Sequence, residues 1–190
     1  KNIRVSYSQT EIVSDVKELR HELVREAMKM AGITGGIEVT SIADIPAGTG
    51  LGSSSTFTVG VLNALFTYCG KRLSERQLAE RACQIEIDLL GHPIGKQDQY
   101  AAAHGGLNYF QFNADESVSY DRITLSDDCW HDMNRKLMLF YTGITRSADG
   151  VLSEQKKNTA SKLDNLNYMK RQADEMHKEL METGFNAHFG

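Results

Sequence analysis

Apolar side chains recur along the first part of the chain with the short spacing of strands and then with the longer spacing of helices. The β-branched segment at residues 2–8 predicts a strand. A helix is predicted to begin at Ser14, because apolar residues then recur every three or four positions until Gly32. Residues 37–45 predict a second strand, which leads into a loop rich in glycine and serine.

The segment after this loop, residues 54–68, is mainly apolar, with small residues dispersed among the large ones. It predicts a buried helix that packs closely on its neighbours. Ser74 and Gln77 have the spacing of a capping box, so another helix is predicted to start there and to stop at about Leu90, before a Gly-His-Pro turn. A short helix is predicted at residues 97–104.

The second half of the chain predicts strands followed by helices. Three alternating or apolar segments predict strands, at residues 107–112, 117–125 and 136–142. Residues 147–183 predict two helices with a break near residues 158–161. Without a repeat or a linker, residues 1–150 are expected to form one α+β unit.

Composition narrows the class of protein. The 190 residues are 41% hydrophobic and 24% charged, as in ordinary soluble globular proteins. A net charge of -4 argues against nucleic acid as a partner. No apolar run is long enough to span a membrane and the first residues lack a signal peptide, so no membrane partner and a cytoplasmic location are expected. Cys69, Cys83 and Cys129 lack the spacing of a zinc site or disulfide framework and are expected to be reduced, largely buried thiols.

The loop at residues 46–55, PAGTGLGSSS, places unhindered backbone N–H groups at the start of a helix, which is an arrangement suited to an anion. A Walker A loop would need Lys and then Ser or Thr after its last glycine, but Gly52 is followed by Ser53 and Ser54. A dinucleotide-binding fingerprint would need a glycine at position 53. A hydrolase nucleophile elbow would need a glycine at position 56, where Thr56 stands.

The pattern PxxxGLGSSS in this loop resembles the second signature motif of the GHMP kinases. The resemblance implies an α+β fold of the GHMP kinase type, with helices packed on a mixed sheet. It implies an ATP-binding N-terminal domain at residues 1–135, lacking its first motif, and the start of a C-terminal domain at residues 136–190. It also implies that ATP is bound by the loop residues Pro46, Ala47, Gly48, Thr49, Gly50, Leu51, Gly52, Ser53, Ser54 and Ser55.

Phosphoryl transfer needs a metal ion and a group that orients or deprotonates the acceptor hydroxyl. The resemblance implies that Glu86 and Ser54 bind Mg²⁺, which prefers hard oxygen ligands. It places Asp98 beside the acceptor hydroxyl as the base. Lys96 lies two residues before Asp98 and is expected to stabilise charge on the transferring phosphoryl group. Two alternatives stay open, a solvated surface role for Glu86 and a purely dipole-favoured helix position for Asp98.

The segment GKQDQY at residues 95–100 narrows the resemblance to the kinases that phosphorylate sugars at the anomeric hydroxyl. It implies ATP and Mg²⁺ as cofactors and a sugar or sugar phosphate, such as a heptose 7-phosphate, as the small-molecule partner. Thr145 and Arg146 are then expected to bind the substrate phosphate, with an ordinary surface loop as the alternative.

The first and third motifs of the family do not occur in residues 1–190, so the chain is expected to be the middle part of a longer protein. Other functional interpretations remain open. They are another GHMP sugar kinase of the fucokinase or galactokinase type, a nucleotide-binding regulator without catalysis, and a structural fragment that binds nothing.

Overall fold

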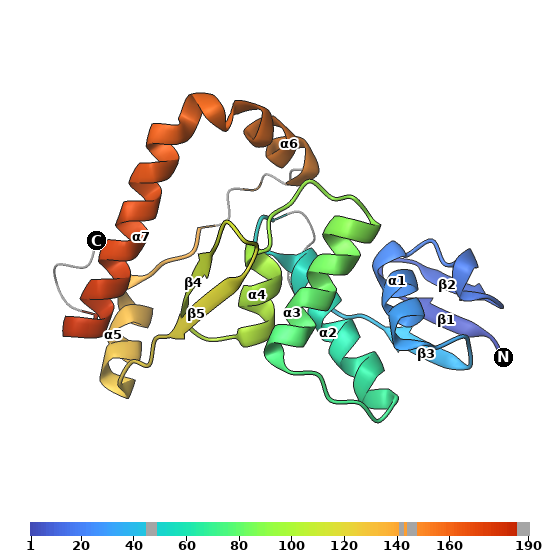
Figure 1. The fold of residues 1–190 in the computed structure, drawn as a ribbon. Helices are drawn as coiled ribbons and strands as arrows, with labels where there is room; N and C mark the ends of the chain where they lie inside the picture. Colours follow the sequence, from blue (N-terminus) through green and yellow to red (C-terminus); the bar gives the residue numbers. More distant parts are fainter. Residues whose placement is uncertain (45–48, 141–142, 144–147, 186–190) are drawn as a thin grey trace. The chain divides into compact units, whose positions relative to one another are not determined.

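A computed structural model describes residues 1–44, 49–140, 143 and 148–185 of the chain (Figure 1). The chain divides into two compact units, Lys1–His104 with Thr145–Leu152, and Gly105–Ile144 with Ser153–Gly190. This division differs from the single unit expected over residues 1–150, because the second unit has an apolar core of its own. The boundary expected between the two family domains, after residue 135, stays a prediction.

The first unit contains a three-stranded mixed sheet. Its strands are β1 (Ile3–Ser6), β2 (Thr10–Val13) and β3 (Ile37–Thr40). Their order is β2-β1-β3, with β2 antiparallel and β3 parallel to β1. Ile3 and Val5 of the central strand are buried, whereas Arg4 between them points outward and pairs with Glu38 at 3.4 Å. The alternation of strand residues thus directs one face of the sheet toward the core.

Two elements take the place of the single helix predicted from Ser14. They are the 3-10 turn η1 (Val16–Glu18) and the helix α1 (Glu22–Ala31). Between them the buried carboxylate of Glu11 accepts hydrogen bonds from the backbone N–H groups of Arg20 and His21, at 2.6 and 3.0 Å. Glu11, the acceptor of these bonds, lies on strand β2, which the sequence analysis did not predict. The pattern of apolar residues alone therefore did not reveal that the helix starts later than Ser14.

Helices complete the first unit. They are α2 (Ser53–Tyr68), α3 (Glu75–Cys83), the π-helix η2 (Gln84–Leu89) and α4 (Gln97–His104). The helix predictions for these segments are confirmed, as is the capping box of Ser74 and Gln77. Helix α2 contacts α1, α3 and α4, and its residues Leu62 and Leu65 are buried in the shared core. The strand predicted at residues 37–45 ends at Thr40.

The second unit is built around a hairpin and a long helix. Its strands β4 (Asn108–Phe112) and β5 (Val118–Arg122) are antiparallel. Its helical elements are α5 (Asp127–Lys136), the turn η3 (Ala160–Lys162) and α7 (Leu163–Thr183). Helix α6 (Ala148–Asn158) is divided between the two units after Leu152. The predicted break near residues 158–161 is confirmed. The core of the unit contains Ile123, Leu125, Leu180 and Phe185.

The strand predicted at residues 136–142 is not observed in its described part. Lys136 ends α5, a helix that the sequence analysis missed, and residues 137–140 have no regular structure. Leu139 in this run is 83% exposed. Within the described part of the chain no strand pairs with this run, and an apolar segment forms a strand only when a neighbour supplies hydrogen bonds.

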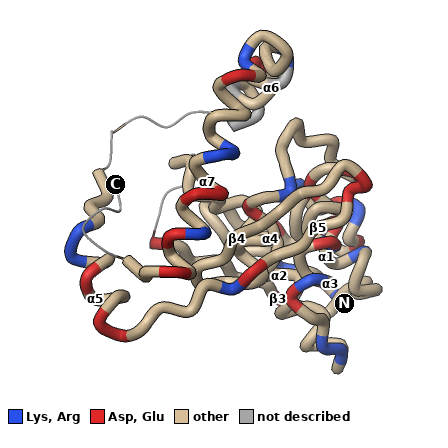
Figure 2. Tube along the Cα trace, turned by 60° about the vertical axis from the view of Figure 1, so that its left-hand side comes forward, with Lys and Arg blue, Asp and Glu red and all other residues tan. Residues whose placement is uncertain are grey.

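The described surface has mixed charge. Along α7 acidic and basic positions are interspersed (Figure 2). No helix in the described ranges has the length and apolar character that crossing a membrane requires. The three cysteines are free, and Cys83 is buried as expected, whereas Cys69 is exposed and departs from that expectation.

Candidate active site

Two glycines in the left-handed conformation form the start of α2. Gly50 has a φ of 78° and Gly52, the N-cap residue, has a φ of 66°, a conformation that residues with a side chain rarely adopt. Among the described residues no side chain caps this helix start, and the first described backbone bond runs from the N–H of Thr56 to the C=O of Gly52 at 2.9 Å. The N–H groups ahead of Thr56 belong to Ser53, Ser54 and Ser55. They have no partner within the helix and favour a bound anion.

Some predicted site residues lie outside the described residues. They are Pro46, Ala47 and Gly48 of the loop, and Thr145 and Arg146 of the expected substrate-phosphate site. The described part of the loop runs from Thr49 to Ser55, and Leu51 within it is 50% exposed.

The carboxylate of Glu86 is completely buried next to the start of α2. Its Oε1 accepts hydrogen bonds from Ser54 Oγ at 2.7 Å and from Thr58 Oγ1 at 3.2 Å. Its Oε2 accepts from Ser55 Oγ at 2.9 Å and from Gln99 Nε2 at 2.5 Å. This burial rules out the alternative of a solvated surface glutamate. Sequence reasoning paired only Ser54 with Glu86 and missed Thr58, Ser55 and Gln99. Thr58 could have been found, because it follows Ser54 by four positions on a predicted helix and so shares its face.

The π-helix η2 directs Glu86 toward α2. It continues α3 with a wider turn, in which the N–H of Leu90 bonds to the C=O of Ile85 at 3.0 Å. Ile85 and Glu86 are both fully buried, whereas Leu89 is 54% exposed. The wider turn shifts the helix face that faces the core, and π-turns of this kind often occur at functional sites.

Asp98 in the first turn of α4 lies against the N-cap of α2. A Cβ atom placed on Gly52 would lie 3.2 Å from both Cγ and Oδ2 of Asp98, so the absence of a side chain at Gly52 makes room for this carboxylate. Asp98 is exposed, and its carboxylate is therefore accessible beside the anion-binding helix start. Asp98 thus occupies a first-turn position that the dipole of α4 favours, and its carboxylate also lies beside the start of α2.

The positive charge of Lys96 bears on Cys83, the last residue of α3. Burial raises the pKa of Cys83 to about 12, and the positive charge of Lys96 acts against this rise. Lys96 thus lies close to the junction of α3 and η2. Its expected action on a transferring phosphoryl group stays a prediction.

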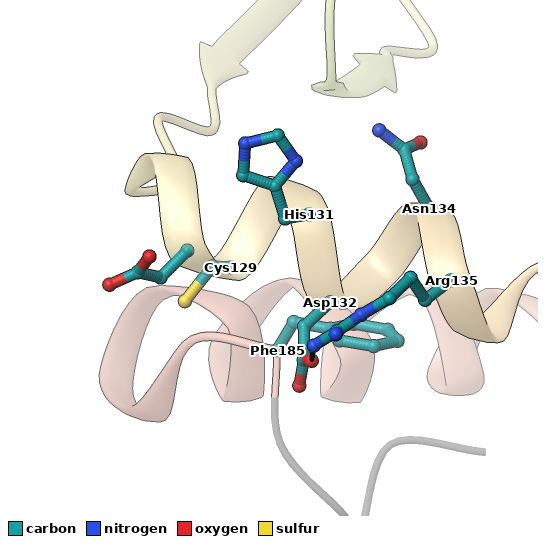
Figure 3. A pocket seen from close by; sticks show the side chains of 7 residues that line it. Cys129, His131, Asp132, Asn134, Arg135 and Phe185 are labelled. Carbon is teal, nitrogen blue, oxygen red and sulfur yellow. Dashed lines mark hydrogen bonds and ion pairs between the residues drawn. The ribbon is translucent and has the colours of Figure 1, made fainter.

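A pocket of about 690 Å³ lies in the second unit, beside α5 (Figure 3). Residues of α5 and Phe185 line it, and none of them is a predicted site residue. Asp132 in this pocket is paired with Arg135 at 2.6 Å and with Lys136 at 3.1 Å, and hydrogen bonds from these two side chains lower its pKa.

Among the described residues no cluster of three or more His, Cys, Asp or Glu could hold a metal ion. The predicted residues Ser54, Glu86 and Asp98 meet at the start of α2, which is the candidate site.

The class of protein follows from a family comparison. Residues 16–106 match the family model described as the GHMP kinases N terminal domain. This range includes Gly52, Glu86 and Asp98. Residues 16–106 therefore form a domain of the GHMP kinase N-terminal type, and the chain is similar to the GHMP kinases.

Individual relatives are sugar kinases by name. The chain is 33% identical over 145 residues to a D-glycero-alpha-D-manno-heptose 7-phosphate kinase of Campylobacter jejuni, covering 75% of this chain and 43% of the relative. It is 36% identical over 156 residues to an L-fucokinase/L-fucose-1-P guanylyltransferase of Bacteroides fragilis, covering 79% of this chain and 16% of the relative.

A solved structure has the same fold. The crystal structure of a D-glycero-D-manno-heptose 1-phosphate kinase from Bacteroides thetaiotaomicron is 27% identical, with a TM-score of 0.62 over 67% of this chain and 46% of that chain. The predicted α+β fold of the GHMP kinase type is confirmed. The chain spans less than half the length of each of these three proteins.

Proposed function

We propose that this chain is part of an ATP-dependent kinase that phosphorylates a sugar or sugar phosphate at its anomeric hydroxyl. The proposed substrate is D-glycero-D-manno-heptose 7-phosphate, which would become the 1,7-bisphosphate. The observation that carries the proposal is the convergence of Glu86 and Asp98 on the glycine-capped start of α2. The names of the two sugar kinases above support the substrate class.

In this proposal the start of α2 binds the phosphates of ATP through the N–H groups of its first turn. Ser54 Oγ and Glu86 Oε1, which are 2.7 Å apart, fit Mg²⁺ because a hydroxyl and a carboxylate oxygen are both hard ligands. Bound Mg²⁺ would offset the negative charge of the phosphates. Thr58, Ser55 and Gln99 hold the Glu86 carboxylate in place.

Asp98 has the proposed role of the base. The acceptor oxygen forms a bond to the γ-phosphorus while the bond between that phosphorus and ADP breaks, and the hydroxyl proton passes to the Asp98 carboxylate. Lys96 would stabilise the developing negative charge. Thr145 and Arg146 would bind the 7-phosphate, and the cytoplasm is the proposed location.

An assay of ADP release tests the proposal. The whole protein that contains this chain is mixed with ATP, Mg²⁺ and each of three sugars, namely heptose 7-phosphate, fucose and galactose. Heptose 7-phosphate is expected to release ADP above the ATPase background, and Asp98→Asn is expected to lower this rate by about 100-fold or more while ATP still binds. Binding of ATP without ADP release from any sugar would overturn the proposal in favour of a non-catalytic nucleotide-binding regulator.

A further inference from the structure

Gln99 is a fully buried amide in contact with the Glu86 carboxylate. Its Nε2 donates to Glu86 Oε2 at 2.5 Å, while its own Oε1 is buried without a hydrogen-bond partner among the described residues. Buried amides normally have both polar ends bonded, because leaving one unbonded costs free energy. The amide cannot be turned around to relieve this, since its oxygen would then face the acceptor-only oxygens of Glu86. The bond to Glu86 therefore determines how Gln99 is oriented.

Gln99 also links the two carboxylates of the site through the backbone. It directly follows Asp98, whose carboxylate lies against Gly52, while its own side chain reaches Glu86. The other donor to Oε2 is Ser55 of α2, at 2.9 Å. Two donors from two helices thus hold Oε2 on the buried side.

The remaining oxygen, Oε1, accepts from buried Thr58 at 3.2 Å and from Ser54 at 2.7 Å, and Ser54 is the one exposed residue among the four donors to Glu86. Holding Oε2 in the interior therefore keeps Oε1 on the side from which a cation can approach. A carboxylate without this anchor would be free to rotate about its last side-chain torsion, which has broad preferences.

We propose that Gln99 is a positioning residue that fixes Glu86 for Mg²⁺ binding, an inference that rests on the proposed function. Gln99 acts through Glu86 and not on the phosphates directly. Residues that hydrogen-bond a metal ligand typically contribute about 10-fold to 100-fold to metal affinity, and this is the effect expected of Gln99.

Binding of ATP to the 190-residue chain at increasing Mg²⁺ concentrations, followed by titration calorimetry, tests this role. Gln99→Met keeps the length of the side chain but removes the donor. The variant is expected to need about 10-fold to 100-fold more Mg²⁺ for half-maximal enhancement of ATP binding. Its ATP binding in the presence of a metal chelator is expected to equal that of the wild type.

A matched control separates positioning from general destabilisation. Leu62→Ala removes apolar contacts of a fully buried side chain in α2. Leu62 is not among the residues that hydrogen-bond the Glu86 carboxylate. It should lower the melting temperature without changing the Mg²⁺ requirement. Gln99→Leu serves as the second variant if circular dichroism shows that Gln99→Met does not fold.

The outcomes distinguish the two proposals. Loss of metal-dependent and metal-free ATP binding in equal proportion in the Gln99 variants would show a merely structural role and overturn the inference. An unchanged Mg²⁺ requirement would overturn it as well. A wild-type chain whose ATP binding does not respond to Mg²⁺ would instead overturn the proposed function, and this is visible before any variant is measured.

Discussion

Replacing Glu86 by alanine is expected to destabilise the first unit strongly, whatever the chain binds. Ser54 is exposed, and Thr58 keeps a second acceptor in the C=O of Ser54 at 3.0 Å. Ser55 Oγ and Gln99 Nε2 are buried, and among the described residues both donate their hydrogen bond to Glu86. Glu86→Ala therefore leaves two buried donors unbonded.

The expected magnitude follows from these two donors. Each unbonded donor costs about 1–3 kcal/mol, so together they lower the free energy of unfolding by about 2–6 kcal/mol. Removing a buried carboxylate also relieves its desolvation cost, which moves the net value toward the lower end of this range. Against a total stability of about 5–15 kcal/mol for a typical domain, the loss is large.

Glu86→Gln is the informative companion variant. Its amide oxygen can still accept from Gln99 Nε2, and its NH₂ group can donate to Ser54 and Thr58, whose hydroxyls rotate to accept. Only the additional strength of bonds to a charged acceptor is lost, so a smaller cost of about 1–2 kcal/mol is expected.

Urea unfolding followed by far-ultraviolet circular dichroism measures both variants. Glu80→Ala, at an exposed position of α3, is the control and is expected to change stability by less than about 0.5 kcal/mol. The reasoning would be refuted if Glu86→Ala were as stable as the control, or if Glu86→Gln were as costly as Glu86→Ala.

Two further predictions rest on other features of the first unit. Gly52→Ala and Gly50→Ala should each lower the free energy of unfolding by about 1–2 kcal/mol, because alanine is strained in the left-handed conformation. Only the Cβ at position 52 would press on Asp98, so the rate of ADP release should fall about 10-fold more for Gly52→Ala than for Gly50→Ala; equal losses of activity would refute this. The folded pKa of Cys83 is about 12 against an ordinary value of about 8.5, so the stability that its buried thiol contributes is complete below about pH 8.5 and is lost as the pH rises toward 12. Iodoacetamide near pH 8 should therefore modify exposed Cys69 much faster than Cys83, as measured by mass spectrometry; equal rates would contradict the assigned burial.

Local features of this protein could be predicted because their causes lie within a few residues. The capping box of Ser74 and Gln77 joins residues three positions apart, and the positive φ of Gly52 follows from the freedom of glycine. The strand at residues 136–142 was a wrong prediction for its described part, since strand formation depends on a partner that the apolar pattern does not specify.

The environment of Glu86 could not be predicted from its neighbours in the chain. Its hydrogen bond with Ser54 spans 32 positions, and its bond with Gln99 connects η2 with α4. The π-turn that orients Glu86 also left no signal in the apolar spacing, because that spacing was consistent with a continuous α-helix.

The sequence by itself determined that a glycine loop precedes a helix suited to an anion, because backbone freedom and helix dipoles depend on local residue types. A motif resemblance added the family and the two carboxylates. Only the tertiary structure decided that Glu86 is buried and held by four donors, and that Asp98 lies against Gly52. Such convergence depends on how α2, η2 and α4 pack together, and packing is a property of the whole core rather than of any one segment.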